Sequence, residues 1–246
     1  MAKVMLVGES WSVTSIHAKG FDTFTTVDYA EGGAALIGAL EQEGHEVVYL
    51  PSHVAATDFP STVEGLSEVD VVLLSDIGSN TLLLPSSTFV KGQVGVNRLD
   101  VLVDWVRAGG GFAMVGGYLS FQGIEAKANY KNTSIADILP VTMLDGDDRV
   151  ETPQGVVPEV SGPHTVVDGL SFEAPLLGYQ RLIPREDAQT LLTVGADPLL
   201  VLGTEGAGRT LAYASDIGPH WAPEAFTGAE AFAKLWGRAA DWLAGN

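Results

Sequence analysis

Hydrophobic and polar positions along the first half of the chain predict strands and helices in alternation. Two segments place apolar side chains at helical spacing, and a glycine follows each of them: residues 33–43 and 99–106. Short, mostly apolar runs occupy residues 4–7, 46–50, 69–74 and 112–115. Runs of this kind are typical of parallel strands that are covered on both faces. The alternation predicts a doubly wound, mostly parallel α/β sheet with right-handed crossovers.

The second half of the chain has a different rhythm. Residues 140–186 are rich in proline and glycine and predict short strands. The segment Glu205–Gly208 is typical of a hairpin turn, and the apolar stripe from Phe232 to Leu243 predicts a final core helix. Longer apolar runs occupy residues 188–194, 199–204 and 209–215. Antiparallel strands are therefore expected in the C-terminal half, and residues 1–246 are interpreted as one domain.

Composition and charge exclude several function classes. The formal net charge of −18, with only 13 lysines and arginines, argues against nucleic-acid binding, because a polyanion needs a basic surface. The absence of cysteine removes disulfides, thiolate metal sites and cysteine nucleophiles together. No apolar stretch approaches the roughly 18 residues of a membrane span, and the N-terminal run is too short for a signal peptide. A cytoplasmic protein without membrane contact is expected.

Polar and aromatic residues follow four of the predicted strands. Ligands of open α/β sheets bind beyond the carboxyl ends of the strands, so these residues together predict a pocket for a polar small molecule. Each residue alone also has a structural explanation, such as a turn hydrogen bond or a packed ring. The set comprises Glu9, Trp11, His17 and Lys19; Asp76 and Asn80; Gly116, Gly117, Tyr118, Ser120 and Phe121; and Asp216, His220 and Trp221. The segment GESWSVTSIHAKGFDTF, which carries the first four, is predicted to be a loop.

Other motifs in the sequence carry less information. No G-x-G-x-x-G or G-x-x-x-x-G-K-[ST] loop is present, so no nucleotide cofactor is expected. The turn after the fourth strand also lacks the G-x-S-x-G pattern of a serine hydrolase. The acidic residues Asp145, Asp147, Asp148 and Glu151 are interpreted as a solvated loop, with metal binding as the alternative.

Several long stretches of the chain resemble the class I glutamine amidotransferase-like superfamily. Within it, the chain is similar to the glutamine amidotransferase-like group that is related to the ThuA-like (trehalose-utilisation) proteins. The resemblance spans nearly the whole chain and implies a flavodoxin-like fold that forms homo-oligomers. It is carried by SIHAKGFDTF, LLSDIGSNTLLLP, GGGFAMVGGYLSFQGI, LPV followed by DDRVE, LLGY and SDIGPHW.

The resemblance implies a catalytic elbow after the fourth strand, where working amidotransferases carry a cysteine. Here Tyr118, or Gly117 one residue earlier, takes that place, whereas His220 with Glu224 is similar to the family's histidine segment. Glutamine hydrolysis proceeds through a thioester and needs a thiolate. We therefore expect no glutaminase activity.

Without the thiolate, the elbow is expected to bind rather than to attack. Its backbone N–H groups are predicted to hold an anion or a polarised oxygen. Aromatic side chains near it are expected to offer faces to a sugar ring or another flat ligand. These are Trp11, Tyr118, Phe121 and Trp221.

Three functional hypotheses follow. The favoured one is a pocket for a polar molecule such as a carbohydrate or polyol derivative, with His220 as acid or base, oriented by Asp216 or Glu224, and Tyr118 positioning an oxygen. The second is a non-catalytic binding or assembly subunit. The third is a metal-dependent hydrolase that would use His17, Asp76, Asp216 and His220.

Overall fold

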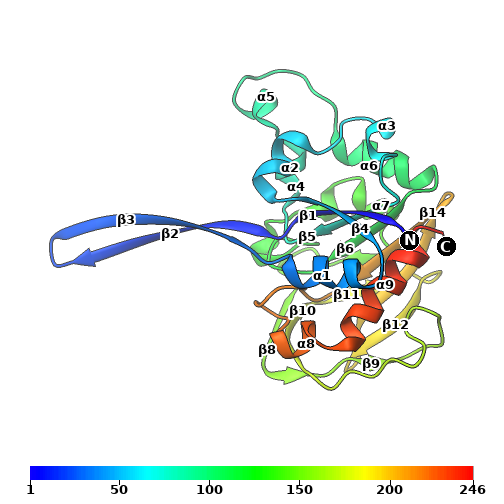
Figure 1. The fold of residues 1–246 in the computed structure, drawn as a ribbon. Coiled ribbons are helices and arrows are strands. Elements are labelled where there is room, and N and C mark those ends of the chain that lie inside the picture. The colour runs from blue at the N-terminus through cyan, green and yellow to red at the C-terminus, as the bar shows by residue number, and fades with distance from the viewer. Residues whose placement is uncertain (246) are drawn as a thin grey trace.

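A computed structural model describes residues 1–245 and shows an eight-stranded sheet at the centre of the molecule (Figure 1). The strand order is β4-β1-β5-β6-β14-β13-β12-β9, and the first five strands are parallel. This parallel part has the order of flavodoxin-like folds. Its strands are β4 (Glu46–Leu50), β1 (Lys3–Gly8), β5 (Val71–Ser75), β6 (Gly111–Val115) and β14 (Gly208–Tyr213). The predicted α/β sheet is confirmed.

Antiparallel strands extend the sheet in the C-terminal half, as predicted. The turn between β13 and β14 contains Gly206, whose φ of 60° suits a hairpin. Two separate two-stranded ribbons pair β10 with β8 and β11 with β7. The strands are β13 (Asp197–Glu205), β12 (Gln189–Val194), β9 (Glu159–Val160), β10 (Leu176–Gln180), β8 (Arg149–Val156), β11 (Leu182–Pro184) and β7 (Val141–Met143).

Helices cover both faces of the sheet (Figure 1). On one face α1 (Ala34–Gln42) packs against α9 (Glu230–Leu243), and on the other α6 (Arg98–Arg107) packs against α3, α4 and α7. The short helices are α2 (Ser52–Asp58), α3 (Val63–Leu66), α4 (Ser79–Leu83), α5 (Ser86–Phe89), α7 (Ile135–Ile138) and α8 (Glu224–Thr227), with 3-10 turns at η1 (Ile124–Ala126) and η2 (Tyr130–Asn132). None of the helices within residues 1–245 has the length and hydrophobicity that crossing a membrane requires.

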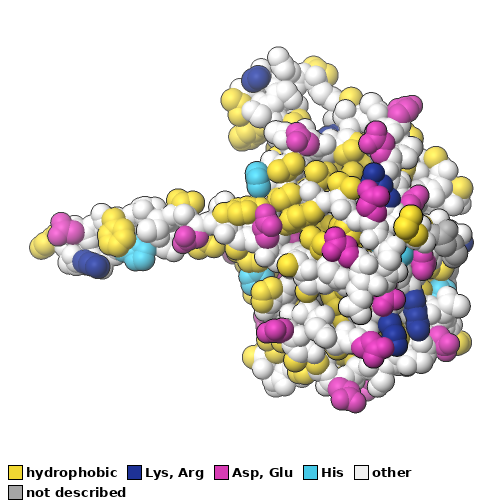
Figure 2. Space-filling model, viewed as in Figure 1, with side chains coloured by type: hydrophobic (Ala, Val, Ile, Leu, Met, Phe, Trp, Pro, Cys, Tyr) yellow, Lys and Arg dark blue, Asp and Glu magenta, His cyan; other side chains and the backbone are white. Residues whose placement is uncertain are grey.

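The segment predicted to be a loop after β1 is instead a long β-hairpin. Strands β2 (Ser10–Lys19) and β3 (Asp22–Glu31) pair over their whole length and stand clear of the body (Figures 1 and 2). The loop prediction was wrong because the segment is rich in threonine, valine and aromatic residues, which favour strands, and Gly20 turns the chain with a φ of 67°. We call residues 10–31 the arm.

A buried arginine ties together the helices that follow β4 and β5. Arg98, at the start of α6, is only 4 % exposed. Its guanidinium group donates to the carbonyl oxygens of Ala55, Ala56, Thr81 and Leu82 at 2.7–3.2 Å. These carbonyl groups belong to α2 and α4, and α4 begins three residues after Asp76. The arginine therefore helps to fix the chain that leaves the sheet at Asp76.

We expect Arg98→Ala to lower the free energy of unfolding by about 3 kcal/mol, because four carbonyl groups lose their donor in a buried place. Urea denaturation followed by circular dichroism measures the loss. Arg107→Ala, on the same helix but exposed and paired with Glu205, is the control and should cost clearly less. Equal losses in the two variants would contradict this role of Arg98.

Candidate functional site

The carboxyl ends of four neighbouring strands bring most of the predicted residues together. Strands β1, β5, β6 and β14 lie side by side in the sheet. The hydroxyl group of Ser75, at the end of β5, donates to Oε2 of Glu9 at 2.5 Å. The backbone N–H of Leu119, after β6, donates to Oδ1 of Asp76 at 2.6 Å. The first three strand ends are thus joined by direct hydrogen bonds.

Unusual backbone conformations occur where these strands end. Glu9 and Asp76 have φ values of 49° and 43°, in the left-handed region that non-glycine residues seldom adopt. The backbone of Glu9 is held from three sides: its N–H donates to the Ser75 carbonyl at 2.8 Å, and its carbonyl accepts from Gly32 N at 2.9 Å and Tyr49 Oη at 3.0 Å. Such strain costs about 1–3 kcal/mol per residue and is concentrated at functional sites.

Two fully buried carboxylates lie beneath this surface. Glu9 and Asp216 both have an exposed fraction of 0 %. A Cβ atom at Gly218 would lie 2.8 Å from Oε1 of Glu9 and 3.5 Å from Oδ1 of Asp216, so both carboxylates border the same glycine. Within residues 1–245, Oε1 of Glu9 and Oδ2 of Asp216 have no hydrogen-bond partner. Both atoms are enclosed by the protein, so these two carboxylates act on the site through their charge rather than by direct contact with solvent.

The carboxylates influence one another's protonation. Burial, and then the charges of Asp216 and Asp76, raise the pKa of Glu9 well above its usual range. Burial, and then the charge of Asp216, raise the pKa of Asp76 to about 6. Glu9 is therefore the acid of this group that most readily keeps its proton.

His220 lies at the rim above these acids. Its Nδ1 is 3.7 Å from Oδ2 of Asp216, and 39 % of its side chain is exposed. The nearby carboxylate of Asp216 raises the pKa of His220, because it favours the protonated imidazole. The imidazole ring lies 4.9 Å from the Trp11 ring and 5.6 Å from the Tyr118 ring, centroid to centroid. Two aromatic side chains and a buried carboxylate thus orient an accessible histidine.

Tyr118 connects His220 to a second group of residues that the sequence did not place in the pocket. The guanidinium carbon of Arg149 lies 5.0 Å from the centre of the Tyr118 ring. Trp221 meets the tyrosine edge to face at 5.5 Å and donates from Nε1 to Oε2 of Glu151 at 3.0 Å. Burial, and then the charge of Glu151, raise the pKa of Tyr118. The sequence indicated Arg149 only through the DDRVE stretch, and Glu151 through that stretch and the acidic group of residues 145–151, without placing either in the pocket.

Three backbone donors of the elbow after β6 are engaged within the protein. The N–H of Gly117 donates to Oε1 of Gln180 at 3.3 Å, and that of Ser120 donates to the Gly117 carbonyl at 3.3 Å. The N–H of Leu119 donates to Oδ1 of Asp76, so these three groups already have acceptors, and the anion-binding role of the elbow stays a prediction. Gln180 has no local signal in the sequence, because only the fold brings β10 to the elbow.

Four of the predicted residues lie apart from this cluster. His17 and Lys19 are on the exposed arm, where the histidine ring stacks on Phe24 at 4.5 Å. Asn80 is exposed on α4, and Glu224 is exposed at the first turn of α8. The set His17, Asp76, Asp216 and His220 is thus not brought together in one chain, and Asp216 rather than Glu224 faces His220.

Two aromatic residues and one serine are less accessible than expected. Phe121 is 0 % exposed and Trp221 is 1 % exposed, with its indole packed over Gly178. The expectation that Phe121 and Trp221 offer open faces to a ligand was therefore wrong, because both rings fill the core beneath the rim. Ser120 is also buried, and its hydroxyl accepts from the N–H of Asp76 at 3.1 Å. Trp11 and Tyr118 keep accessible ring surface.

The acidic residues 145–151 are engaged in separate local contacts. Asp145 pairs with Lys131, and Asp147 pairs with Arg149 at 2.9 Å. Asp148 is buried and accepts from the N–H groups of Gln122 and Gly123 at 3.0 and 2.9 Å. In the part of the chain that the structure describes, no three His, Asp or Glu side chains are grouped so that they could hold a metal ion.

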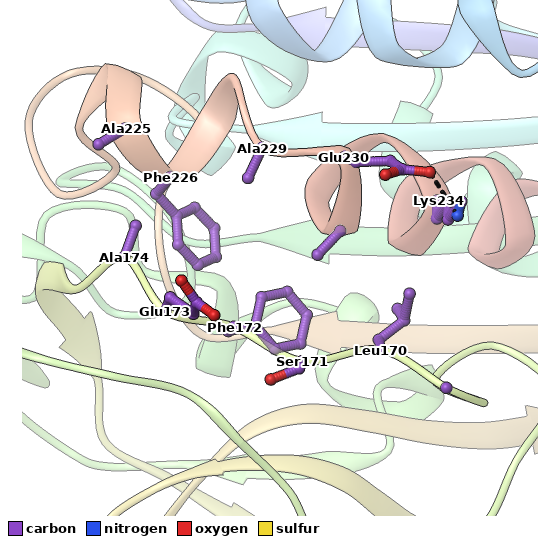
Figure 3. A pocket seen from close by; sticks show the side chains of 12 residues that line it. Leu170, Ser171, Phe172, Glu173, Ala174, Ala225, Phe226, Ala229, Glu230 and Lys234 are labelled. Atoms are coloured by element: carbon purple, nitrogen blue, oxygen red, sulfur yellow. Dashed lines mark ion pairs between the residues drawn. The ribbon is translucent and has the colours of Figure 1, made fainter.

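A hollow of about 740 Å³ lies away from the strand ends, between residues 169–174 and helices α8 and α9 (Figure 3). Its floor is formed by Phe172 and Phe226, whose rings stack at 5.8 Å. At its rim Glu230 pairs with Lys234 at 2.5 Å. None of the sequence-predicted residues lines this hollow, and its charged pair is already satisfied. The strand-end cluster, with its strained backbone and unpaired carboxylate oxygens, is the stronger candidate site.

Comparisons with known proteins agree with this architecture. A family model described as "Putative glutamine amidotransferase" matches residues 3–245. Two solved structures of Salmonella typhimurium, the Cytoplasmic Proteins STM3548 and STM1381 (the latter from strain LT2), are 44 % and 45 % identical to the chain. Each covers 98 % of the chain, with 98 % and 99 % of its own length and a TM-score of 0.95. No curated protein matches the chain.

More distant structures share the fold alone. A ThuA-like protein from Bacteroides uniformis is 14 % identical, covers 98 % of this chain with 90 % of its own and has a TM-score of 0.55. The Salmonella structures match more than the body. Their matches span 98 % of this chain, so they include the arm.

We expect Asp76→Asn to stabilise the protein at pH 7.5 by about 1–2 kcal/mol and to leave its stability unchanged at pH 4. A folded-state pKa of about 6, raised from the ordinary value, stabilises the fold at low pH, and this stabilisation is lost as the pH rises through 6. Asparagine does not ionise, so the variant does not lose this stability as the pH rises, and its side-chain oxygen can still accept the hydrogen bond from the N–H of Leu119. Urea denaturation at the two pH values measures the difference. Asp145→Asn, at an exposed carboxylate, is the control, and an equal gain there would contradict the assignment.

We also expect Asp216→Asn to lower the pKa of His220, because the acceptor charge that raises it is removed. Asparagine keeps the hydrogen bonds that Oδ1 accepts from the N–H groups of Ile217 and Gly218. NMR titration of the histidine ring protons, assigned with His220→Ala, measures the change. Glu224→Gln is the control and should leave the titration unchanged. If the pKa of His220 fell in Glu224→Gln but not in Asp216→Asn, Glu224 rather than Asp216 would be the residue that orients the histidine.

Proposed function

The chain belongs to the family of glutamine amidotransferase-like proteins, and we propose that within it this member binds a neutral, hydroxyl-rich small molecule at the strand ends and does not hydrolyse glutamine. The observation that carries the proposal is the group of carboxylates formed by the buried Glu9 and Asp216 and the half-buried Asp76, beneath the accessible rings of Trp11, Tyr118 and His220.

The absence of glutaminase activity follows from the nucleophile position. The chain has no cysteine, and the turn after β6 offers Gly117 and Tyr118 in its place. A tyrosine hydroxyl has an ordinary pKa of about 10, and its surroundings raise the pKa of Tyr118 further. It is therefore a poor nucleophile near neutral pH. The hydroxyl remains suited to positioning an oxygen of the ligand.

The ligand class follows from charge and from the hydrogen-bonding groups that are free. Three acids close together repel anions, and the elbow donors at Gly117, Leu119 and Ser120 are already engaged. Carboxylate oxygens accept from hydroxyl groups, and exposed aromatic rings offer a stacking surface for a sugar ring. A carbohydrate or polyol derivative matches both features. Such a ligand is also consistent with the fold shared with a ThuA-like protein.

If a reaction follows binding, His220 is the group that moves the proton. It is accessible, it lies beside Tyr118, and Asp216 orients it from the buried side. Because Asp216 raises the pKa of His220, the imidazolium form persists to higher pH, which favours proton donation over abstraction near neutral pH.

A second candidate is a non-catalytic assembly subunit that retains the fold. The observation that favours it is the arm, which projects from the body beside the site. We also propose that residues 1–246 form one domain, supported by one continuous hydrophobic core, and that the protein is cytoplasmic, as the two similar Salmonella proteins are described.

A thermal-shift comparison of neutral sugars and polyols with the corresponding sugar phosphates tests the ligand class. At a hundred times its dissociation constant a ligand stabilises by about 2.7 kcal/mol, which is roughly 5–10 °C for a chain of this size. We expect neutral ligands to give this shift, and their phosphates and glutamine to give little. His220→Ala and Tyr118→Phe should reduce the shift, and Glu224→Gln should not.

Three results would contradict the proposal. A larger shift with sugar phosphates than with the neutral sugars would show that the site prefers anions. Ammonia release from glutamine by the purified wild-type protein, absent from Tyr118→Phe, would show that the elbow retains glutaminase chemistry. A ligand shift unaffected by His220→Ala would place the site elsewhere.

A further inference from the structure

The two faces of the arm differ in chemistry. Directly paired residues of an antiparallel hairpin share a face, and successive residues alternate between faces. One face carries the charged residues Lys19, Asp22 and Asp28. The other face carries Glu31 at the root of the arm and no charged residue from there to the tip. Beyond Glu31 it consists of Ser12, Thr14, Ile16, Ala18, Thr23, Thr25, Val27 and Tyr29. We call this second surface the neutral face.

Side chains on the charged face satisfy one another. Phe24 is covered by the ring of His17 at 4.5 Å, and the ammonium group of Lys19 lies 5.7 Å from the same aromatic ring. Nε2 of His17 also reaches the hydroxyl of Thr26 at 3.2 Å. Phe24 nevertheless stays 50 % exposed and Val13 41 % exposed, so contacts within the arm cover only part of the apolar surface of this face.

The neutral face also presents apolar side chains to solvent. Ile16 is 75 % exposed and Val27 is 68 % exposed, although the chain carries a net charge of −18. An isolated two-stranded hairpin is marginally stable in water. A long, projecting ribbon with one face free of charge is therefore suited to packing against another protein surface.

The same chain carries a second exposed apolar surface. Residues 84–97, which include α5, leave five aliphatic or aromatic side chains exposed: Leu84, Phe89, Val90, Val94 and Val96. The neutral face looks toward this side of the molecule, because Tyr29 meets His53 of α2 edge to face and α2 packs on α4, which precedes α5. Figure 1 shows α5 and the arm extending from the body with open space between them.

We propose that the neutral face of the arm packs against residues 84–97 of a second copy of this chain, and that the two copies exchange arms reciprocally about a two-fold axis. In such a dimer the neutral face of each copy is buried against residues 84–97 of the other, so both exposed apolar surfaces of both copies are covered. Lys91 is the one charged side chain of residues 84–97, so the receiving surface is nearly as free of charge as the neutral face.

The contact area agrees with a stable dimer. Ten residues per strand span about 33 Å, and two paired strands are about 10 Å wide, so one face offers roughly 330 Å². Two arms and two receiving surfaces would bury about 1,300 Å² in total, within the range of specific protein interfaces. The matches to the two Salmonella proteins also include the arm, which is therefore a regular part of this fold. This inference does not depend on the ligand proposed for the strand-end site.

Analytical ultracentrifugation of the purified full chain tests the proposal. We expect a wild-type mass of twice 25.8 kDa. Ile16→Lys should weaken the dimer by at least about a hundredfold, because each dimer would bury two unpaired ammonium groups, each costing at least tenfold. Phe89→Lys on the receiving surface should weaken it similarly. Ser15→Lys, one residue away on the charged face, is the matched control and should sediment as wild type.

Each other outcome would overturn the proposal. A wild-type monomer at 100 µM (about tenfold above a weak dimer constant of 10 µM) would exclude a second copy as the occupant. A dimer that survives Ile16→Lys, or that Ser15→Lys disrupts equally, would exclude the neutral face. A dimer that survives Phe89→Lys would exclude the receiving surface, and a larger ring would exclude reciprocal exchange. Circular dichroism and thermal unfolding of each variant show whether the body stays folded.

Discussion

The crowding of three carboxylates at the carboxyl edge of the sheet is the constraint on which the rest of the site depends. Glu9, Asp76 and Asp216 each follow a parallel strand. Strands β1 and β5 are neighbours in the sheet, whereas β6 lies between β5 and β14, so the chain that follows β14 brings Asp216 to the group. Keeping these carboxylates buried requires space beside their oxygens, and glycine provides that space at positions 32 and 218. It also requires left-handed backbone at Glu9 and Asp76. The energy that this arrangement costs is offset by the large apolar sheet below it.

The same crowding accounts for the chemistry of the rim. Because Asp216 is buried and unpaired on one oxygen, its charge acts on His220, the nearest accessible group. Because Asp76 accepts from the N–H of Leu119, one backbone donor of the elbow that acyl transfer could use is already engaged. Loss of the thiol and engagement of the donors are thus two independent departures from amidotransferase chemistry at one turn. After these two changes, the turn after β6 presents mainly hydrogen-bond acceptors.

The arm joins the site to the molecular surface through its first residues. Trp11, at the root of the arm, lies against His220, while the tip extends about 30 Å away. A second copy that holds the arm would therefore also restrain the tryptophan that borders the histidine. Assembly and ligand binding would then share one structural element. The arm occupies the place of an ordinary strand-to-helix loop between β1 and α1.

The sequence alone determined the parallel sheet, its covering helices, the added antiparallel strands and the absence of a thiol nucleophile. These depend on local apolar runs, helical spacing and composition, which are read along the chain without long-range information. The arm was misjudged as a loop although its threonines and aromatic residues favour strands, because its polar residues suggested a loop and its pairing partner was not considered. Only the tertiary structure decided that Gln180 and Asp76 engage the elbow donors, that Phe121 and Trp221 are buried, and that Asp216 rather than Glu224 faces His220. Each of these depends on contacts between segments many residues apart, and their geometry is set by strand order and packing.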